Sequence, residues 1–398
     1  MSMRKDVVAG RFDCPYPPEG LAGPLGGRPW LGLTVAERQE RAFLEAGVPL
    51  ESTLPEDKTR LLVREDVVLT RDAVVALLEA AGGADASWVP AGRAGVFHRQ
   101  VALGDAGPWL VALAPGGPVT PERIAAAAPV EVPLKERMLT FPLSEAHHGV
   151  AAVELPISDR LVLPTHHWLQ LLWANLLGLG PFLWRGLVGR NIIQVACRVG
   201  WAVLRALSVN PRRVGAKLGR KGTGCQIHPS AVVEGCWLGD DVEVGAGAVV
   251  RGCVLADGAA VEDLAMVEFS VLAPGARVQR QAMVKFSVLG VNCAAGGLMQ
   301  LGTLDRNSAL KRTGVLMDMA LGQGVQIVLN GARVPAPLGL AGVCVGAGSV
   351  VGAGVHVAPG RAIPPDLKVV AGPHSTLARI PEGAGGTMVI RDGTLEPL

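Results

Sequence analysis

The sequence predicts an α/β N-terminal domain and an all-β parallel β-helix, joined by a helical connector. Three observations predict this division. Residues 1–160 mix apolar runs with helix-like stretches and do not repeat, residues 161–222 are first apolar and then basic, and residues 223–372 repeat. We expect residues 373–398 to form a C-terminal tail. A length of 398 residues leaves room for two or three domains, and 52 Gly with 29 Pro suit a turn-rich solenoid.

The N-terminal prediction depends on local patterns within residues 1–160. Apolar runs at 61–63, 67–69 and 75–78 accompany a helix-like stretch at 35–46. Such a mixture of short apolar runs and helical stretches is typical of an α/β layer.

Parts of this domain resemble sugar-phosphate nucleotidyltransferases. Residues 24–31, which read PLGGRPWL, are similar to the segment that follows the phosphate loop of those enzymes. Residues 62–69 resemble the strand that ends at their metal-binding aspartate, and Asp66 matches that position. Trp168 and Asn175 resemble positions in the linker helix of the same enzymes. The resemblance implies a sugar-nucleotide site, with Mg²⁺ bound by Asp66 if nucleotidyl transfer survives.

The residues before Pro24 depart from that family. Its members begin with a Gly-rich loop that carries an Arg and then a Pro-Lys pair, whereas residues 12–23 read FDCPYPPEGLAG. Phosphoryl-type transfer depends on positioning and on neutralising phosphate charge, so the loss of this loop should cripple it. We therefore expect a degenerate domain kept for packing or ligand sensing, and we predict no metal site unless nucleotidyl transfer survives.

The connector, residues 161–222, begins with 24 residues that lack Lys, Arg, Asp and Glu. That length could span a bilayer. Pro164, His166, Asn175 and Pro181 interrupt the stretch, which favours a buried or interfacial helix pair. A second helix is predicted over 192–207, because its apolar residues follow 3.6-residue spacing.

The charge of the connector is strongly one-sided. Between Asp159 and Glu234 the chain has ten basic residues and no acidic one, so this segment carries +10 and leaves about −8 for the rest. A cationic amphipathic helix flanked by Trp suits an anionic membrane surface. The alternative is a helical hairpin packed between the two domains. Nucleic-acid binding is disfavoured because no reader motif accompanies the charge. The predicted membrane contacts are Trp184, Arg198, Trp201, Arg205, Arg212 and Arg213.

The β-helix prediction comes from a 17-residue repeat between Ile227 and Leu289. Three aliphatic columns with spacings of 6, 6 and 5 predict three short sides for each coil. A second tract, from Val345 to Val369, steps by six. Between the two tracts, residues 290–344 are predicted to interrupt the coils, with a partial coil near 321–327. The columns are Ile227/Val244/Val261/Val278, Val233/Val250/Val267/Val284 and Leu238/Leu255/Leu272/Leu289.

These repeats resemble the hexapeptide-repeat transferases, whose members fold as left-handed parallel β-helices. The resemblance implies a homotrimer with sites at the subunit borders. Acyltransferases of this family use a His as general base, and a neutral imidazole suits that role. His356, just before an inward position, is the candidate catalytic residue. Asn292, Asp305 and Arg306, in the predicted interruption, are candidate substrate-binding residues, although the last two could equally form a surface ion pair.

Three functional hypotheses remain from the sequence. The first is a hexapeptide-repeat transferase that moves an acyl group from acyl-CoA or a carrier to a sugar or nucleotide-sugar. The second is a catalytically inactive scaffold that trimerises and attaches to anionic membrane. The third is sugar-nucleotide binding or residual nucleotidyl transfer. The seven Cys show no metal spacing and residues 1–10 lack an apolar core, so we expect a cytoplasmic protein, peripheral to the inner membrane face in the second hypothesis.

Overall fold

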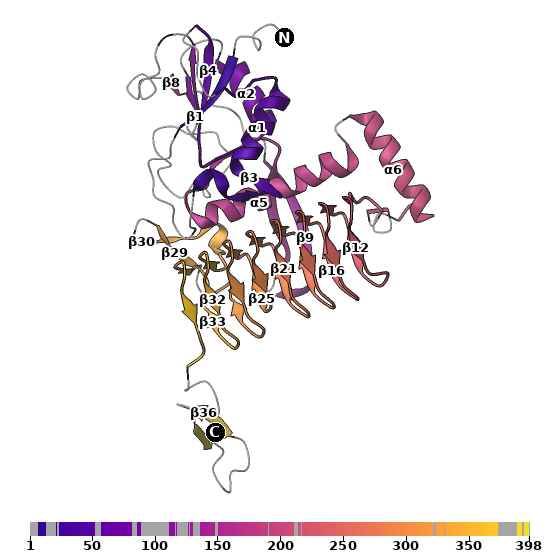
Figure 1. Cartoon of the computed structure of the whole chain (residues 1–398), viewed down its shortest axis with the longest axis vertical. Helices are drawn as coiled ribbons and strands as arrows, with labels where there is room; N and C mark the ends of the chain where they lie inside the picture. Colours follow the sequence, from indigo (N-terminus) through magenta and orange to yellow (C-terminus); the bar gives the residue numbers. More distant parts are fainter. Residues whose placement is uncertain are drawn as a thin grey trace.

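The structure is a computed structural model of the whole chain (Figure 1). It describes residues 7–12, 21, 24–51, 57–81, 86–88, 111–115, 117, 126, 128–129, 136–147, 150–189, 191–210, 214–215, 217–320, 324–329, 331–372, 388–391 and 394–397.

In its described residues, the N-terminal domain is a mixed sheet with two helices, in agreement with the predicted α/β class. The strand order is β1-β4-β7-β6-β8, with β1 parallel to β4 and β4 antiparallel to β7. Its elements are β1 (Val7–Phe12), α1 (Val35–Ala46), β4 (Thr59–Arg64), α2 (Arg71–Ala81), β6 (Ala86–Trp88), β7 (Val111–Pro115) and β8 (Ala128–Pro129).

Helix α1 coincides with the predicted helix at 35–46, and its capping interactions explain where it begins and ends. Thr34 accepts a hydrogen bond from the backbone N–H of Glu37 (3.2 Å), and the Glu37 carboxylate accepts one from the N–H of Thr34 (2.8 Å). This capping box satisfies two donors at the helix start. The helix ends at Gly47, whose φ of 78° favours glycine. Its buried face, which includes Phe43, packs on the sheet.

Further strands and a short helical turn complete this part of the chain and lead to the connector. β5 pairs with β11 in an antiparallel manner, and β9 and β10 form a long hairpin. Their bounds are η1 (Leu25–Gly27), β2 (Pro29–Trp30), β3 (Leu33–Thr34), β5 (Val67–Leu69), β9 (Glu136–His147), β10 (Val150–Ser158) and β11 (Val162–Pro164).

The connector contains α5 (Trp168–Leu183), a π-helical turn η2 (Trp184–Val188) and α6 (Ile192–Ala206). Together α5 and η2 form the one described helix that is long and apolar enough to cross a membrane. Most side chains of α5 are nevertheless buried inside the protein. The expectation of a buried helix therefore describes α5, whereas α6 is largely exposed.

The C-terminal part is a parallel β-solenoid of about eight turns, as the repeat predicted. Three sheets, here called faces A, B and C in chain order, form its sides (Figure 1). Face A contains β12 (Gln226–Ile227), β15 (Glu243–Val244), β18 (Ala260–Val261), β21 (Arg277–Val278), β24 (Ala294–Ala295), β27 (Ala309–Leu310), β32 (Val350–Val351) and β35 (Lys368–Val369). Face B contains β13 (Val232–Glu234), β16 (Val249–Arg251), β19 (Met266–Glu268), β22 (Met283–Lys285), β25 (Leu298–Gln300), β28 (Val315–Leu316) and β33 (His356–Val357). Face C contains β14 (Trp237–Leu238), β17 (Val254–Leu255), β20 (Val271–Leu272), β23 (Val288–Leu289), β26 (Thr303–Leu304), β31 (Cys344–Val345) and β34 (Ala362–Ile363).

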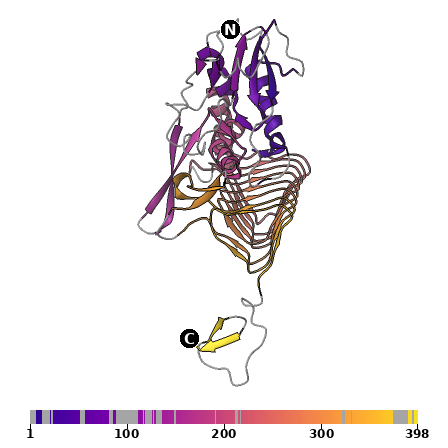
Figure 2. The ribbon, with the colours of Figure 1, turned by 90° about the vertical axis from the view of Figure 1, so that its left-hand side faces the viewer.

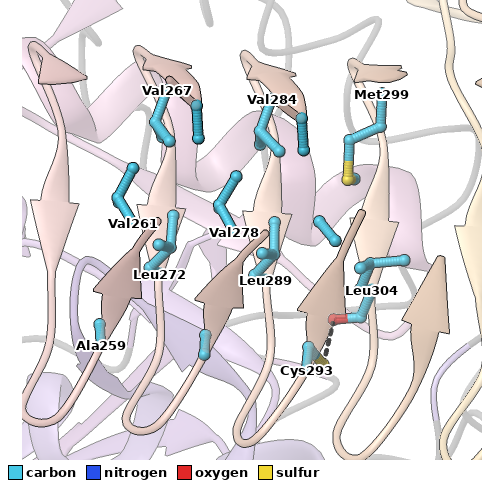
Figure 3. Close-up of a cluster of buried hydrophobic side chains, with 14 of the residues drawn as sticks. Ala259, Val261, Val267, Leu272, Val278, Val284, Leu289, Cys293, Met299 and Leu304 are labelled. Atoms are coloured by element: carbon cyan, nitrogen blue, oxygen red, sulfur yellow. Dashed lines mark hydrogen bonds between the residues drawn. The ribbon is translucent and has the colours of Figure 1, made fainter. Parts of the chain in front are cut away.

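The predicted columns are the inward rows of the three faces. Figure 3 shows Val261 and Val278 from face A, Val267 and Val284 from face B, and Leu272 and Leu289 from face C meeting inside the coils. All six side chains are buried. The thiol of Cys293 fills one corner and donates to the carbonyl of Leu304 at 3.6 Å. Each coil thus adds one layer to a continuous apolar core.

The interruption predicted at 290–344 is too wide. Strands β24, β25, β26, β27 and β28 continue the coils as far as Leu316. The inward column of face B is hard to follow in the sequence because β25 follows β22 by 15 residues instead of 17. Gly296 and Gly297 make the shorter corner possible, since a Cβ on Gly297 would lie 2.0 Å from the carbonyl oxygen of Gly314.

Between β12 and β35, the described residues that leave the solenoid lie within 317–343, at the corner between faces B and C. Residues 321–323 of the partial coil expected near 321–327 lie outside the described residues, and Gln326 and Ile327 belong to an antiparallel hairpin, in which Ile327 pairs with Val334. Ile327 is fully buried in the same cluster as α5. The hairpin and its neighbours are β29 (Gln326–Leu329), β30 (Ala332–Pro335) and η3 (Pro337–Gly339), and a last hairpin near the C-terminus pairs β36 (Met388–Arg391) with β37 (Thr394–Pro397).

Helix α5 lies between the N-terminal domain and face C (Figure 2). One buried cluster contains Leu31 and Val68 of the N-terminal domain, most of α5, and the outward residues Val254, Val271 and Val288 of face C. Asn175 on α5 accepts from the backbone N–H of Leu31 (2.9 Å) and donates to the carbonyl of Pro29 (3.1 Å). These contacts fix the N-terminal domain against the solenoid.

We predict that shortening one inward side chain destabilises the solenoid. Leu272→Ala should lower the free energy of unfolding by about 3 kcal/mol, because Leu272 is fully buried and its loss leaves a cavity. Leu264→Ala should cost under about 1 kcal/mol, because Leu264 is 60% exposed at a corner of the same coils. Denaturant unfolding of both variants measures the difference, and equal losses would contradict the assignment of the inward column.

Candidate functional site

A cleft of about 520 Å³ lies between the N-terminal domain, the end of α5 and the first coils. Arg38 and Arg41 of α1 line one wall, and Phe182 and Arg185 line another. The solenoid contributes Trp237 and the corner that follows it. This volume is in the range of small-molecule sites.

Two cations and two aromatic rings form a continuous stack along the cleft. The Arg38 guanidinium carbon lies 4.5 Å from the centre of the Phe182 ring, and that ring lies 5.2 Å from the Trp237 ring. The Arg220 guanidinium carbon lies 4.1 Å from the Trp237 ring. Cations are attracted to aromatic faces, so the stack keeps both guanidinium groups at the cleft wall.

Arg38 holds the wall together rather than pointing freely into the cleft. Its Nε donates to the carbonyl of Trp30 at 3.2 Å, and its Nη2 donates to the carbonyl of Leu31. Burial and, to a smaller extent, the positive charge of nearby Arg41 lower the pKa of Arg38 to about 10. Two crowded guanidinium groups therefore make this wall favourable for an anion.

Three of the four acidic residues of the lining are used in turns or ion pairs, and the fourth, Glu45, is exposed on α1 within the electrostatic reach of Arg38. Asp159 pairs with Arg185 at 3.1 Å. Asp240 accepts from the backbone N–H of Thr223 (2.7 Å), a bond that lowers the pKa of Asp240. Asp257 accepts from the backbone N–H of Asp240 (2.8 Å). These carboxylates stabilise turns or balance a neighbouring cation.

Arg41 and Arg220 remain as the accessible cations of the cleft. Both side chains are exposed, and neither takes part in an ion pair among the described residues. Five arginines and four acidic residues line the cleft, so it carries a small surplus of positive charge. Such a site can bind an anion that also has a flat or apolar part.

A second, shallower depression of about 740 Å³ lies on face A over the first coils. Both of its arginines are paired, Arg277 with Glu262 (3.4 Å) and Arg280 with Asp263 (2.8 Å). It therefore has less to offer a charged ligand than the cleft.

Asp66, the residue matching the metal-binding aspartate, is completely buried. Its two oxygens accept from Arg64 Nε (2.5 Å) and Nη2 (3.0 Å), and His166 Nδ1 lies 3.5 Å away. Burial alone would raise the pKa of Asp66, but the hydrogen bonds from His166 and Arg64 outweigh it and lower the pKa to about 2. A guanidinium occupies the space that a cation would need, so these surroundings do not fit Mg²⁺.

The predicted substrate-binding residues come together at one corner of the solenoid, between faces C and A. Asn292 is exposed with a φ of 55°, a conformation that this turn requires. Asp305 is buried, and its carboxylate accepts from the backbone N–H of Arg306 at 2.7 Å. Arg306 itself is exposed. Turn formation accounts for Asn292 and Asp305, and Arg306 is the member of the set that faces solvent.

His356 is exposed on face B and lies beside Val315 in the strand register. The structure does not bring it near the corner that contains Arg306, because face A separates the two. It is also far from the cleft. The strand order places β33 five spacings from β16, which is roughly 24 Å at about 4.8 Å per coil.

The predicted membrane contacts lie on an exposed part of the connector where they are described. Trp184 is 59% exposed and Trp201 is 64% exposed. Arg205 is exposed, and Arg198 donates to the carbonyl of Gly186 at 2.6 Å. Arg212 and Arg213 lie outside the described residues.

The sequence prediction did not find the cleft, because its residues are far apart in the chain. One signal was present in the repeat itself. On face C the outward column reads Trp237, Val254, Val271 and Val288, so an aromatic residue replaces valine only in the first coil. That exception marks the first coil, where Trp237 packs against Phe182 near the end of α5 and lines the cleft.

His167 links the connector to the hairpin β29–β30. Its Nδ1 accepts from the backbone N–H of Leu169 (3.1 Å), and its Nε2 lies 3.2 Å from the carbonyl of Val328, to which it donates in the neutral form. Burial lowers the pKa of His167 to about 4. Protonation would put a second donor against the Leu169 N–H, so the folded protein keeps this ring neutral.

We predict that this histidine makes stability depend on pH. The folded protein binds the proton less readily than the unfolded chain, so stability is full above about pH 6.5 and declines as the pH falls toward 4. The loss approaches about 3 kcal/mol, from about 1.4 kcal/mol per pKa unit. His167→Asn keeps a capping oxygen but cannot titrate, so its unfolding midpoint should change less over this range. Parallel pH profiles for the two proteins would contradict the prediction.

Comparisons with known proteins leave the function open. No protein-family model matches the sequence, and no curated protein matches it. Among solved structures, 59 chains match. One is a crystal structure of a candidate acetyltransferase from Bacillus cereus, with 15% identity and a TM-score of 0.18, covering 38% of this chain and 76% of that one. At this identity and TM-score the likeness supports no functional assignment, and the parallel β-solenoid is established by the strand pairing itself.

Proposed function

We propose that the cleft binds a ligand containing a nucleotide, either a nucleotide-sugar or acyl-CoA. The observation that supports this most is the positive surplus beside an aromatic wall, at Arg41, Arg220 and Trp237. Both ligand classes contain a pyrophosphate and a flat base. Arginine guanidinium groups bind phosphate oxygens with two parallel hydrogen bonds, and the aromatic wall suits the base or the sugar.

In this proposal the protein is a transferase of the hexapeptide-repeat type, in which the N-terminal domain takes part in binding. The buried Arg64–Asp66 pair offers no Mg²⁺ site, so nucleotidyl transfer at that position is disfavoured. Acyl transfer from CoA to a sugar or nucleotide-sugar needs no metal at Asp66. The cleft holds the nucleotide part of the donor or of the acceptor.

A second candidate function is acyl transfer with His356 as general base. The observation that favours it is the exposed imidazole on face B, where an acceptor could approach. A ligand in the cleft of the same subunit is roughly 24 Å away at about 4.8 Å per coil. This proposal therefore includes a donor site separate from the cleft, in a groove beside His356 that a neighbouring copy completes in a homotrimer.

We predict that Arg220 contributes to nucleotide binding. Arg220→Gln should weaken binding about tenfold, because a charge-assisted hydrogen bond to phosphate contributes about 1.5 kcal/mol. Arg312→Gln is the matched control, since Arg312 is exposed on the solenoid outside the cleft. Calorimetric titration with UDP-glucose, acetyl-CoA, UDP and pyrophosphate shows which of these ligands the cleft binds. Tight binding of acetyl-CoA alone would indicate the donor, and binding of UDP-glucose alone would indicate the nucleotide-sugar.

If none of these ligands bound, or if Arg220→Gln and Arg312→Gln bound them equally well, the cleft would not be the site. Thermal unfolding of the same samples provides a second reading. A ligand at about a hundred times its Kd adds about 2.7 kcal/mol of stability, which shifts the midpoint measurably.

We also predict that His356→Gln removes acyl transfer while leaving the fold and the cleft unchanged. General-base catalysis contributes about 10²–10⁴-fold, so the rate of thiol release from acetyl-CoA should fall by about that factor. The unfolding midpoint and the affinity of the cleft should stay at their original values. An unchanged rate in an acyl-transfer assay would exclude His356 as the base, and light scattering of the native protein tests the trimer.

A further inference from the structure

Residues 184–210 form an arm that stands off the solenoid beyond its first coil. Figure 1 shows α6 projecting away from the rest of the protein on the side of β12. Several of the most exposed large apolar side chains of the described chain belong to this arm. Ile192 is 84% exposed, Ile193 is 72%, Leu204 is 66% and Leu207 is 91%.

The apolar residues of α6 occupy two adjoining arcs of the helix. At 100° per residue, Val195, Val199 and Ala202 fall on one side, and these residues are half-buried or buried. The adjoining arc contains Ile193, Trp201 and Leu204 and faces solvent. Gln194, Arg198 and Arg205 occupy the narrow polar sector that remains.

The inner arc, which contains Val195, Val199 and Ala202, packs the arm against the rest of the protein. Val195 and Val199 pack against the cluster that contains α5, and Arg198 donates to the carbonyl of Gly186 at 2.6 Å. Asn191 caps the helix by accepting from the N–H of Gln194 at 2.9 Å. These contacts form and orient the helix, and they leave uncovered the outer arc, which contains Ile193, Trp201 and Leu204.

The charged residues of the chain segment that contains this arc have a single sign. Every ionisable Asp, Glu, Lys or Arg between Arg160 and Val233 is basic, for a segment charge of +10. Arg205 borders the exposed arc on the helix itself, next to Trp201 on the helical wheel. An apolar helix surface whose charged neighbours on the same helix are all cations suits a lipid bilayer, which is apolar inside and, with anionic headgroups, negative at its boundary.

The size of the arc disfavours a protein partner. A helix of 15 residues is about 22 Å long and about 10 Å wide, so half of its surface offers roughly 350 Å². A standard protein interface takes about 800 Å² from each partner. A second copy of this chain would also bring its own +10 segment toward the same place.

We infer that α6 binds the surface of an anionic lipid bilayer, parallel to its plane. Ile193, Trp201 and Leu204 enter the boundary between headgroups and acyl chains, and Arg205 contacts the phosphates. Helix α5 stays within the protein, so the attachment is peripheral. This inference does not depend on the ligand of the cleft.

The first test is sedimentation of the full-length protein with vesicles made from equal parts of phosphatidylcholine and phosphatidylglycerol. We expect binding to these vesicles at low salt, and weaker binding to phosphatidylcholine alone. Trp201→Ser combined with Leu204→Ser should lower the partition coefficient at least about tenfold, because both side chains would otherwise leave water. Leu44→Ser is the matched control, since Leu44 is 76% exposed on α1.

The charge is tested separately. Arg205→Gln should weaken binding by about fivefold at low salt and much less at high salt, whereas Lys311→Gln on the solenoid should leave it unchanged. The emission of Trp201, taken as the difference between the native protein and Trp201→Phe, should shift to shorter wavelength when vesicles are added. This reading uses the native arm and is independent of how the serine variants fold.

Two results would overturn the inference. One is equal vesicle binding by the native protein and the Trp201→Ser/Leu204→Ser variant, or no binding by either at low salt. The other is a native oligomer, seen by light scattering without lipid, that falls apart in this variant while neither protein binds vesicles. The second result would assign the arc to contact between copies of the chain.

Discussion

The packing of α5 on face C determines where everything else lies. The outward residues of a β-solenoid are normally exposed, but here Val254, Val271 and Val288 are buried under a helix that precedes them in the chain. Because the other side of α5 packs on the N-terminal domain, one helix positions two domains. The cleft forms where α5 ends, and the α6 arm begins there as well. Loss of this contact would separate the walls of the cleft and release the arm together.

The solenoid could be predicted because its sequence repeats the physical requirement of each coil. One inward aliphatic residue per side, at fixed spacing, is enough to identify the three faces and their phase. The predicted interruption at 290–344 was wrong because two residues are missing from the corner at Gly296–Gly297, which changes the spacing of the repeat. The inward positions are nevertheless still filled, by Met299, Leu304 and Leu310. A pattern of fixed period does not tolerate such a deletion, although the coil itself does.

The candidate site was much less predictable than the fold. Residue type suggested Asp66, Asn292 and Asp305, but the structure uses the carboxylate of Asp66 to balance a buried arginine and uses the other two in turns. The cleft depends on contacts between residues such as Arg38 and Phe182, which are 144 positions apart, and no local pattern contains that pairing. His356 remains a sequence prediction: its exposure is compatible with the role of a base and does not test it.

The hairpin β29–β30 has a consequence for how the molecule unfolds. Coils of a solenoid contact only their neighbours, so each end can fray without the other. Here the chain leaves the solenoid after Leu316, reaches back to His167, which precedes the first coil, and then returns to complete the later coils. This contact joins the beginning of the connector to the sixth coil in a single loop. We expect amide hydrogens of α5 and of the late coils to exchange as one cooperative unit, in contrast to the independent ends of an uninterrupted solenoid.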